Sequence, residues 1–118
     1  MMPSWRFFFQ CQGTQINSWN ILGDCVRFLK RISDEIGLNF KIYYPVEKSK
    51  PVVVLTMIGN EPEVKSIILN SHMDVVPVFE EYWTHKPFEA EMDEDGKIFA
   101  RGSQDMKCVG MQYLGAIR

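Results

Sequence analysis

A histidine and two aspartates are the residues of this sequence best suited to metal chemistry. His72 and Asp74 form a His-x-Asp pair directly after an apolar run, and Asp105 follows a glycine-containing loop further along the chain. Neutral imidazole is a good zinc ligand, and a carboxylate two residues away lies on the same side of an extended chain. The Asp74 carboxylate can therefore accept the proton on the other ring nitrogen of His72 and fix its tautomer.

Asp105 adds a group that could serve two metal ions. The two oxygens of a carboxylate can bridge metals about 3.5–4 Å apart, as in two-metal hydrolases. Taken singly, each residue has a simpler explanation. His72 would be a hydrogen-bonded histidine at a strand end, and Asp105 a first-turn residue favoured by the helix dipole. The pattern indicates metal binding only when these residues are considered together.

Helical and alternating patterns supply the elements that would position these side chains. An amphipathic helix is predicted from about Trp19 to Ile36, with Gly37 as its stop. Its apolar positions are Leu22, Cys25, Val26, Leu29, Ile32 and Ile36. Residues 38–44 alternate and predict a strand. The apolar runs at 52–58 and 66–70 predict strands covered on both faces, and the second of these ends at His72.

The C-terminal half predicts a hairpin and a second helix. Residues 88–100 alternate on both sides of an Asp-Gly turn, which is typical of a β-hairpin. A loop at 101–104 follows, with Ser103 as a candidate N-cap, and the apolar spacing from Met106 to Ile117 is helical. Residues 1–18 show no periodicity. The order of elements predicts an α/β fold, a mixed sheet flanked by helices, with an open sheet edge.

Composition excludes several classes of protein. The chain has 118 residues, which is enough for one domain, and a net charge of −2. No basic stripe is present, so nucleic acid is not expected as a partner. No apolar run approaches the roughly 20 residues of a membrane span. We read no targeting signal at the N-terminus and expect a cytoplasmic protein. Cys11, Cys25 and Cys108 are odd in number and show no CxxC, which favours free thiols in a reducing compartment.

Three stretches of the sequence resemble the aminoacylases of the co-catalytic zinc exopeptidase superfamily. They read Asn-Ser-His-Met-Asp-Val-Val-Pro-Val at 70–78, Tyr-Trp-Thr-His-Lys-Pro-Phe at 82–88 and Ile-Phe-Ala-Arg-Gly-Ser-Gln-Asp-Met-Lys-Cys-Val at 98–109. The likeness is continuous over 66–118 and weaker over 22–65. It implies a non-matching segment at 1–20, followed at 21–118 by the N-terminal part of an α/β zinc-exopeptidase-like catalytic domain.

The resemblance also implies roles for the three residues. His72 matches a terminal ligand of one zinc ion, Asp105 the carboxylate that bridges two zinc ions, and Asp74 the catalytic carboxylate that orients the histidine. A cis peptide is implied at Asp105–Met106. The implied activity is the hydrolysis of N-acyl-L-amino acids to a carboxylate and a free L-amino acid. The family enzymes form homodimers through a further domain.

The family pattern is incomplete in these 118 residues. The general-base glutamate and the remaining zinc ligands of the family lie downstream of the matched segment, and Glu80-Glu81 is expected to be a solvated loop pair. The chain alone is therefore expected to be inactive. The alternative is a non-catalytic truncated isoform or gene-model fragment. A third hypothesis is a cysteine hydrolase built on Cys108 and a histidine, although a cysteine nucleophile needs a paired base.

Overall fold

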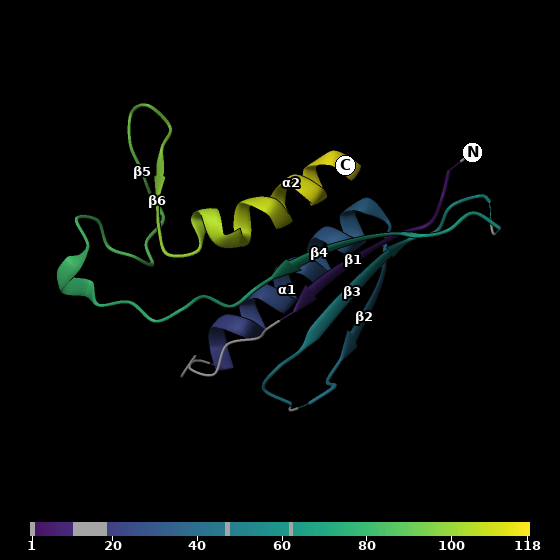
Figure 1. Ribbon diagram of the computed structural model, residues 1–118, viewed down its shortest axis with the longest axis horizontal. Coiled ribbons are helices and arrows are strands. Elements are labelled where there is room, and N and C mark those ends of the chain that lie inside the picture. Colours follow the sequence, from purple (N-terminus) through teal and green to yellow (C-terminus); the bar gives the residue numbers. More distant parts are fainter. Residues whose placement is uncertain (1, 11–18, 47, 62) are drawn as a thin grey trace.

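The computed structural model describes residues 2–10, 19–46, 48–61 and 63–118. Its elements in chain order are β1 Trp5–Gln10, α1 Trp19–Ile36, β2 Asn39–Tyr43, β3 Val52–Met57, β4 Ile67–His72, β5 Glu91–Met92, β6 Ile98–Phe99 and α2 Cys108–Ile117. The first four strands form one mixed sheet in the order β2-β3-β1-β4 (Figure 1). β3 is antiparallel to β1 and β2, and β1 is parallel to β4. The predicted α/β class, a mixed sheet flanked by helices, is confirmed.

Strand β1 was not predicted, and it lies inside the sheet. Phe7 pairs with Leu55 of β3 on one side and with Leu69 of β4 on the other. A strand covered on one face alternates apolar and polar residues, and here Phe8 turns Phe7–Phe9 into an apolar run. In this sequence that run is too short to carry a signal by itself. Trp5–Gln10 therefore belongs to the same sheet as the strands that resemble the aminoacylases.

One face of the sheet carries the core. The side chains of Phe7 and Phe9 lie on the same face as Val53 and Leu55, because paired residues in neighbouring strands share a face. Leu29 of α1 and Leu114 of α2 complete the buried cluster on this side, together with Leu38 and Met73. Both helices therefore pack against the same face.

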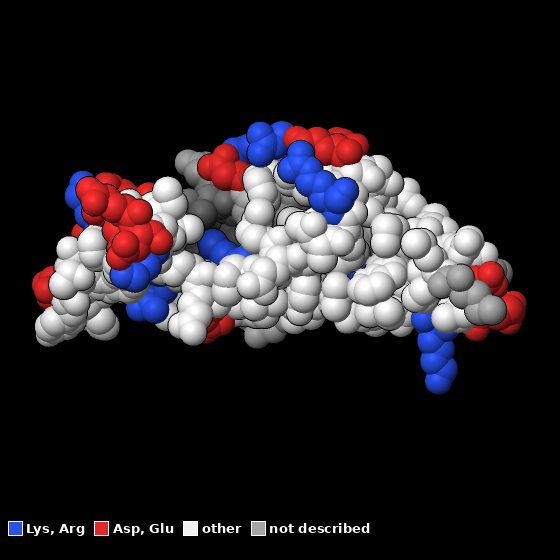
Figure 2. Space-filling model, turned by 90° about the horizontal axis from the view of Figure 1, so that it is seen from above, with Lys and Arg blue, Asp and Glu red and all other residues white. Residues whose placement is uncertain are grey.

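Helix α1 ends as the sequence predicts. Gly37 has a φ of +79°, which a glycine adopts without a Cβ penalty. The Leu38 amide donates to the Ser33 carbonyl over 2.8 Å, and the Ser33 hydroxyl donates to the Leu38 carbonyl over 2.9 Å. The outer side of α1 is charged: Lys30 pairs with Asp34, and opposite charges lie side by side there in Figure 2. A second acidic group in that view marks the end of the molecule that carries the hairpin.

The other face of the sheet lacks cover within the described residues. Val52 and Val54 are only half-buried, and Ile68 is 61% exposed. The prediction that both apolar strands are covered on both faces is therefore wrong for this part of the chain. The two helices are on one side, and β4 is an edge strand with β1 as its neighbour.

The C-terminal half differs from its prediction in detail. The hairpin is confirmed, with Gly96 at φ +80° in the turn, but its strands are two residues each. The second helix begins at Cys108, so Met106 precedes it. Ser103 does not cap this helix; its hydroxyl donates to the Ala100 carbonyl over 2.9 Å. Short polar residues near a helix also close turns, and spacing alone does not distinguish the two uses.

No helix among the described residues is long and apolar enough to span a bilayer.

Replacing Phe7 by alanine tests the role of β1. Phe7 is fully buried, and Phe→Ala in a core costs about 3–5 kcal/mol. We expect the urea unfolding midpoint, followed by circular dichroism, to fall sharply. Phe88→Ala is the matched control because Phe88 is 60% exposed. Equal shifts for the two variants would contradict the central position of β1.

The uncovered face predicts self-association. Exposed apolar strands next to an open edge are templates for pairing between chains. Ile68→Lys should reduce association measured by sedimentation velocity at micromolar concentration. Ile98→Lys, at a comparably exposed position on β6, should leave it unchanged. A monomeric wild-type chain with a cooperative thermal transition would contradict this expectation.

Candidate metal-binding site

The end of β4 and the turn before α2 bring His72 and Asp105 together. His72 is the last residue of β4, and its Nε2 lies 3.0 Å from Oδ1 of Asp105. Two further contacts connect the turn to this strand end. The Ser71 hydroxyl donates to the Met106 carbonyl over 3.4 Å, and the Lys107 ammonium donates to the Met73 carbonyl over 2.9 Å. The expected convergence of the His72 and Asp105 side chains is observed.

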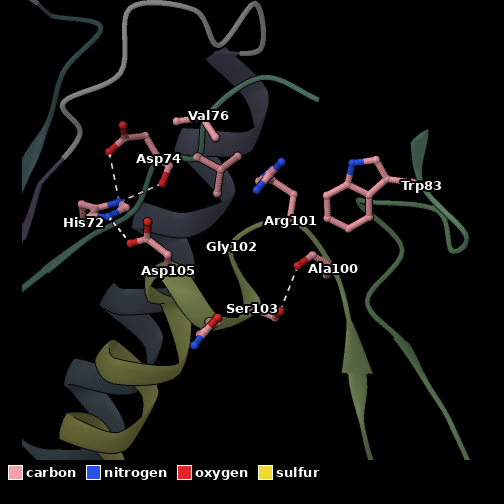
Figure 3. A pocket seen from close by; sticks show the side chains of 11 residues that line it. His72, Asp74, Val76, Trp83, Ala100, Arg101, Gly102, Ser103 and Asp105 are labelled. Atoms are coloured by element: carbon pink, nitrogen blue, oxygen red, sulfur yellow. Dashed lines mark hydrogen bonds and ion pairs between the residues drawn. The ribbon is translucent and has the colours of Figure 1, made fainter. Parts of the chain in front are cut away.

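The second ring nitrogen of His72 defines its tautomer. Nδ1 lies 2.9 Å from the main-chain carbonyl oxygen of Asp74 (Figure 3). A carbonyl oxygen only accepts, so Nδ1 must carry the proton that forms this bond. In the neutral ring, Nε2 then presents its lone pair to the Asp105 carboxylate. Two acceptors that face each other at 3.0 Å need a proton or a metal cation between them.

Asp74 acts on His72 through its main chain rather than its side chain. The nearest carboxylate oxygen of Asp74 is 3.7 Å from Nδ1, too long for a hydrogen bond. The prediction that the Asp74 carboxylate accepts the Nδ1 proton is therefore wrong, because the main-chain carbonyl accepts it instead. It assumed an extended chain from 72 to 74, whereas β4 ends at His72. Asp74 itself is buried, with 8% of its surface exposed.

An irregular turn places Asp105. Residues Ser103–Lys107 form this turn, with Asp105 at φ −112° and ψ 95°. The Asp105–Met106 peptide is cis, as the resemblance implied. Gly102 opens the turn at φ +84°, and a Cβ there would lie 2.4 Å from Cγ1 of Val75. The Lys107 amide closes the turn by donating to the Gly102 carbonyl over 3.0 Å. A glycine is thus required by both conformation and space.

The donors fit part of a zinc site. Two ligands of a tetrahedral zinc ion with bonds of 2.0–2.1 Å are about 3.3 Å apart, close to the observed distance between His72 Nε2 and Asp105 Oδ1. One neutral imidazole nitrogen and one carboxylate oxygen are ordinary zinc donors. Within the described ranges, however, no group of three or more His, Cys, Asp or Glu side chains could hold a metal ion.

A cavity of about 280 Å³ lies beside these two residues. His72, Asp74 and Asp105 line it on one side, and Trp83 and Arg101 also line it. The sequence interpretation gave Arg101 no role. The available signals were its place in the stretch at 98–109 that resembles the aminoacylases and its position before the turn glycine. That position is equally typical of a structural loop residue.

The other candidates lie outside this cavity. Glu80 and Glu81 are exposed in a short 3₁₀ helix at Glu80–Tyr82 and do not line it. The Cys108 thiol donates to the Gln104 carbonyl over 2.9 Å. Within the described part of the chain, no histidine is a hydrogen-bond partner of this thiol. Cys25 and Cys108 are not in a disulfide, and Cys11 lies outside the described residues. His85 contacts Glu91 at 3.0 Å and stacks on Phe99, which indicates a structural role.

Comparison with known families agrees with this fold. Residues 68–118 match the Peptidase family M20/M25/M40. This segment contains the end of β4, the cavity loop, the Asp105 turn and α2. This part of the chain is therefore similar to that family, and the chain is a homologue of aminoacylase-1.

Individual relatives support this assignment. The chain is 50% identical over 96 residues to aminoacylase-1 of Homo sapiens, covering 81% of this chain and 23% of the relative. Identity to aminoacylase-1 of Dictyostelium discoideum is 44% over 92 residues, covering 78% of this chain and 22% of the relative. The Cys-Gly metallodipeptidase dug1 of Schizosaccharomyces pombe is 35% identical over 68 residues, covering 57% of this chain and 14% of the relative. The chain thus spans about a quarter of the length of the aminoacylases that it matches.

Substitution of Gly102 tests how the turn is held. Alanine at a positive φ costs about 1–2 kcal/mol, and at Gly102 the contact with Val75 adds to this cost. Gly96→Ala is the matched control, because Gly96 has a similar φ and open space around its Cβ position. We expect Gly102→Ala to lose more stability in urea unfolding and to shift the imidazole resonances of His72. Equal losses for both variants, with unchanged resonances, would contradict this geometry.

Proposed function

We propose that this chain supplies part of the active site of a zinc-dependent amidohydrolase acting on N-acyl-L-amino acids. The products are a carboxylate and a free L-amino acid. The observation that carries the proposal is the His72–Asp105 pair, in which the imidazole Nε2 and a carboxylate oxygen lie 3.0 Å apart. Homology to aminoacylase-1 supports the substrate class.

Each of the three residues has a separate role at this site. In the proposal, His72 would hold one zinc ion, and Asp105 would help to hold that ion and a second one. The Asp74 carbonyl accepts the hydrogen bond from Nδ1–H and so keeps Nε2 available as a ligand. Zinc supplies Lewis-acid polarisation of an amide carbonyl and of a water molecule. Two donors are fewer than the three protein ligands of a typical catalytic zinc site, so further ligands and the general base are required from outside the described residues.

Zinc binding to the chain tests this assignment. Isothermal titration calorimetry should show weak binding, because only two donors are in place. His72→Asn should weaken it at least about tenfold, since loss of even an indirect partner of a zinc ligand costs roughly 10–100-fold. His85→Asn is a matched control: His85 also faces a carboxylate at 3.0 Å and is similarly exposed.

The control decides between specific and adventitious binding. Equal loss in the His72 and His85 variants would mean that zinc binds histidines at the surface without distinction. Unchanged affinity in His72→Asn would remove the proposed ligand. Either result favours the alternative of a non-catalytic chain.

The isolated 118-residue chain should not turn over substrate. The described residues place neither a full ligand set nor a general base beside the cavity. Release of free amino acid from N-acetyl-L-alanine, followed with an amine-reactive dye, should equal the background rate with added zinc. Turnover that a chelator abolishes would contradict this prediction.

A further inference from the structure

Lys107 connects the two segments that carry the proposed zinc ligands. It stands two residues after Asp105 in the chain, and its ammonium donates to the Met73 carbonyl over 2.9 Å. Met73 stands between His72 and Asp74, and the Asp74 carbonyl lies 2.9 Å from Nδ1 of the His72 ring. One side chain from the Asp105 turn is therefore bonded to the segment that orients the imidazole.

The main chain and the side chain of Lys107 make different bonds. Its amide donates to the Gly102 carbonyl over 3.0 Å and closes the turn that contains Asp105. Its Nζ lies so near Gly102 that a Cβ there would be 3.4 Å away. The first bond makes the turn a closed unit, and the bond to Met73 attaches that unit to the chain after β4. A shift of the turn along β4 would break or lengthen the second bond.

The ammonium group of Lys107 is directed at a carbonyl rather than at a carboxylate. Lys107 is exposed as a residue, and exposed lysines commonly extend into water or join surface ion pairs. Among the described residues, Lys107 forms no ion pair, and Met73 is its side-chain partner. Holding a long side chain in one conformation costs entropy, which a charge-assisted hydrogen bond offsets better than a neutral one. This contact is thus a directed link between two segments.

The link lies outside the cavity that contains the His72–Asp105 pair. His72 lines both that cavity and a second one of about 400 Å³ between α1, α2 and β4. Lys107 and Met73 line only the second cavity, and Asp105 lines only the first. A cation at the His72–Asp105 pair would therefore not share its cavity with the ammonium. This arrangement favours a supporting role for Lys107 over direct contact with metal or substrate.

We propose that Lys107 is a positioning residue, whose bond to the Met73 carbonyl holds the Asp105 turn at the distance from His72 that zinc binding needs. The inference rests on the proposed function for the identity of the metal. The geometry that it explains, the 3.0 Å between Nε2 of His72 and Oδ1 of Asp105, belongs to the chain itself. Donors that are already in place bind more tightly than donors that must first be ordered.

Removal of the ammonium tests the proposal. Lys107→Met keeps an unbranched side chain, and the whole chain is studied at one fixed pH. Without zinc, ¹H–¹⁵N NMR should show faster solvent exchange of the His72 Nδ1 proton, because residues 72–74 lose an anchor. With zinc, calorimetry should show an affinity about tenfold lower, the lower end of the loss when an indirect partner of a zinc ligand is removed.

Two further variants separate position from charge. Lys107→Arg keeps the positive charge and the N–H donors, and it should restore most of the zinc affinity and of the slow exchange. Lys97→Met removes a lysine charge from the hairpin, where Lys97 pairs with the exposed Asp95. This control variant should change neither quantity.

A measurement on the wild-type chain gives an independent test. Coupling between two sites is reciprocal, so a contact that favours zinc binding must itself be strengthened by zinc. Saturating zinc should therefore slow the solvent exchange of the Lys107 ammonium protons and leave that of Lys97 unchanged. This result decides even if Lys107→Met does not fold.

Each other outcome overturns a named idea. Lower stability of Lys107→Met in urea, with unchanged His72 exchange and zinc affinity, would make Lys107 purely structural and overturn the proposal. So would a loss that Lys107→Arg does not restore, an equal effect of Lys97→Met, or ammonium exchange that zinc does not slow. Absence of zinc binding in the wild type would overturn the proposed zinc function instead. The His72 proton exchange in zinc-free Lys107→Met would then decide the role of Lys107 alone.

Discussion

Main-chain hydrogen bonding between β1 and β4 is the interaction on which the position of His72 depends. Among the strands that the structure describes, β4 has β1 as its neighbour, and the two pair in parallel over their whole length. β1 in turn is anchored by Phe7 and Phe9, whose side chains lie in the core between the sheet and the two helices. The register that sets Phe9 opposite Ser71 also sets the end of β4. Because His72 is the last residue of β4, its position depends on the pairing of β4 with β1.

The Asp105 turn is held against that strand end by contacts of a different kind. Gly110 of α2 approaches Phe9 and Ser71 so closely that a Cβ there would lie 3.0–3.1 Å from each. The short distance brings the start of α2, and the turn before it, against β4. The Lys107 ammonium and the Met73 carbonyl add a directed contact at the same place. Packing of a helix on a strand therefore defines the distance between an imidazole and a carboxylate that are far apart in sequence.

The sequence predicted the elements whose signals are local. Helix α1 has a full apolar stripe and a glycine at its end, and the hairpin has an Asp-Gly turn, so both were found. β1 was missed because a short aromatic run has no period, and its place depends on β3 and β4, which are distant in sequence. The pairing of His72 with Asp105 followed from the family resemblance and not from spacing. The role of the Asp74 carbonyl was missed for a further reason. Every residue has a main-chain carbonyl, so the sequence does not mark which one acts, and its direction depends on where the strand ends.

The side chains around the cavity differ in charge, and this difference restricts where a cation can bind. On one side, His72 Nε2 and Asp105 Oδ1 lie 3.0 Å apart, an arrangement that a proton or a metal cation between them satisfies. On the other side, the Arg101 guanidinium lies 5.0 Å from the centre of the Trp83 ring, a cation–π distance. The positive charge of Arg101 disfavours a second cation beside it. A cation in this cavity is therefore favoured next to the His72–Asp105 pair, at the end of β4.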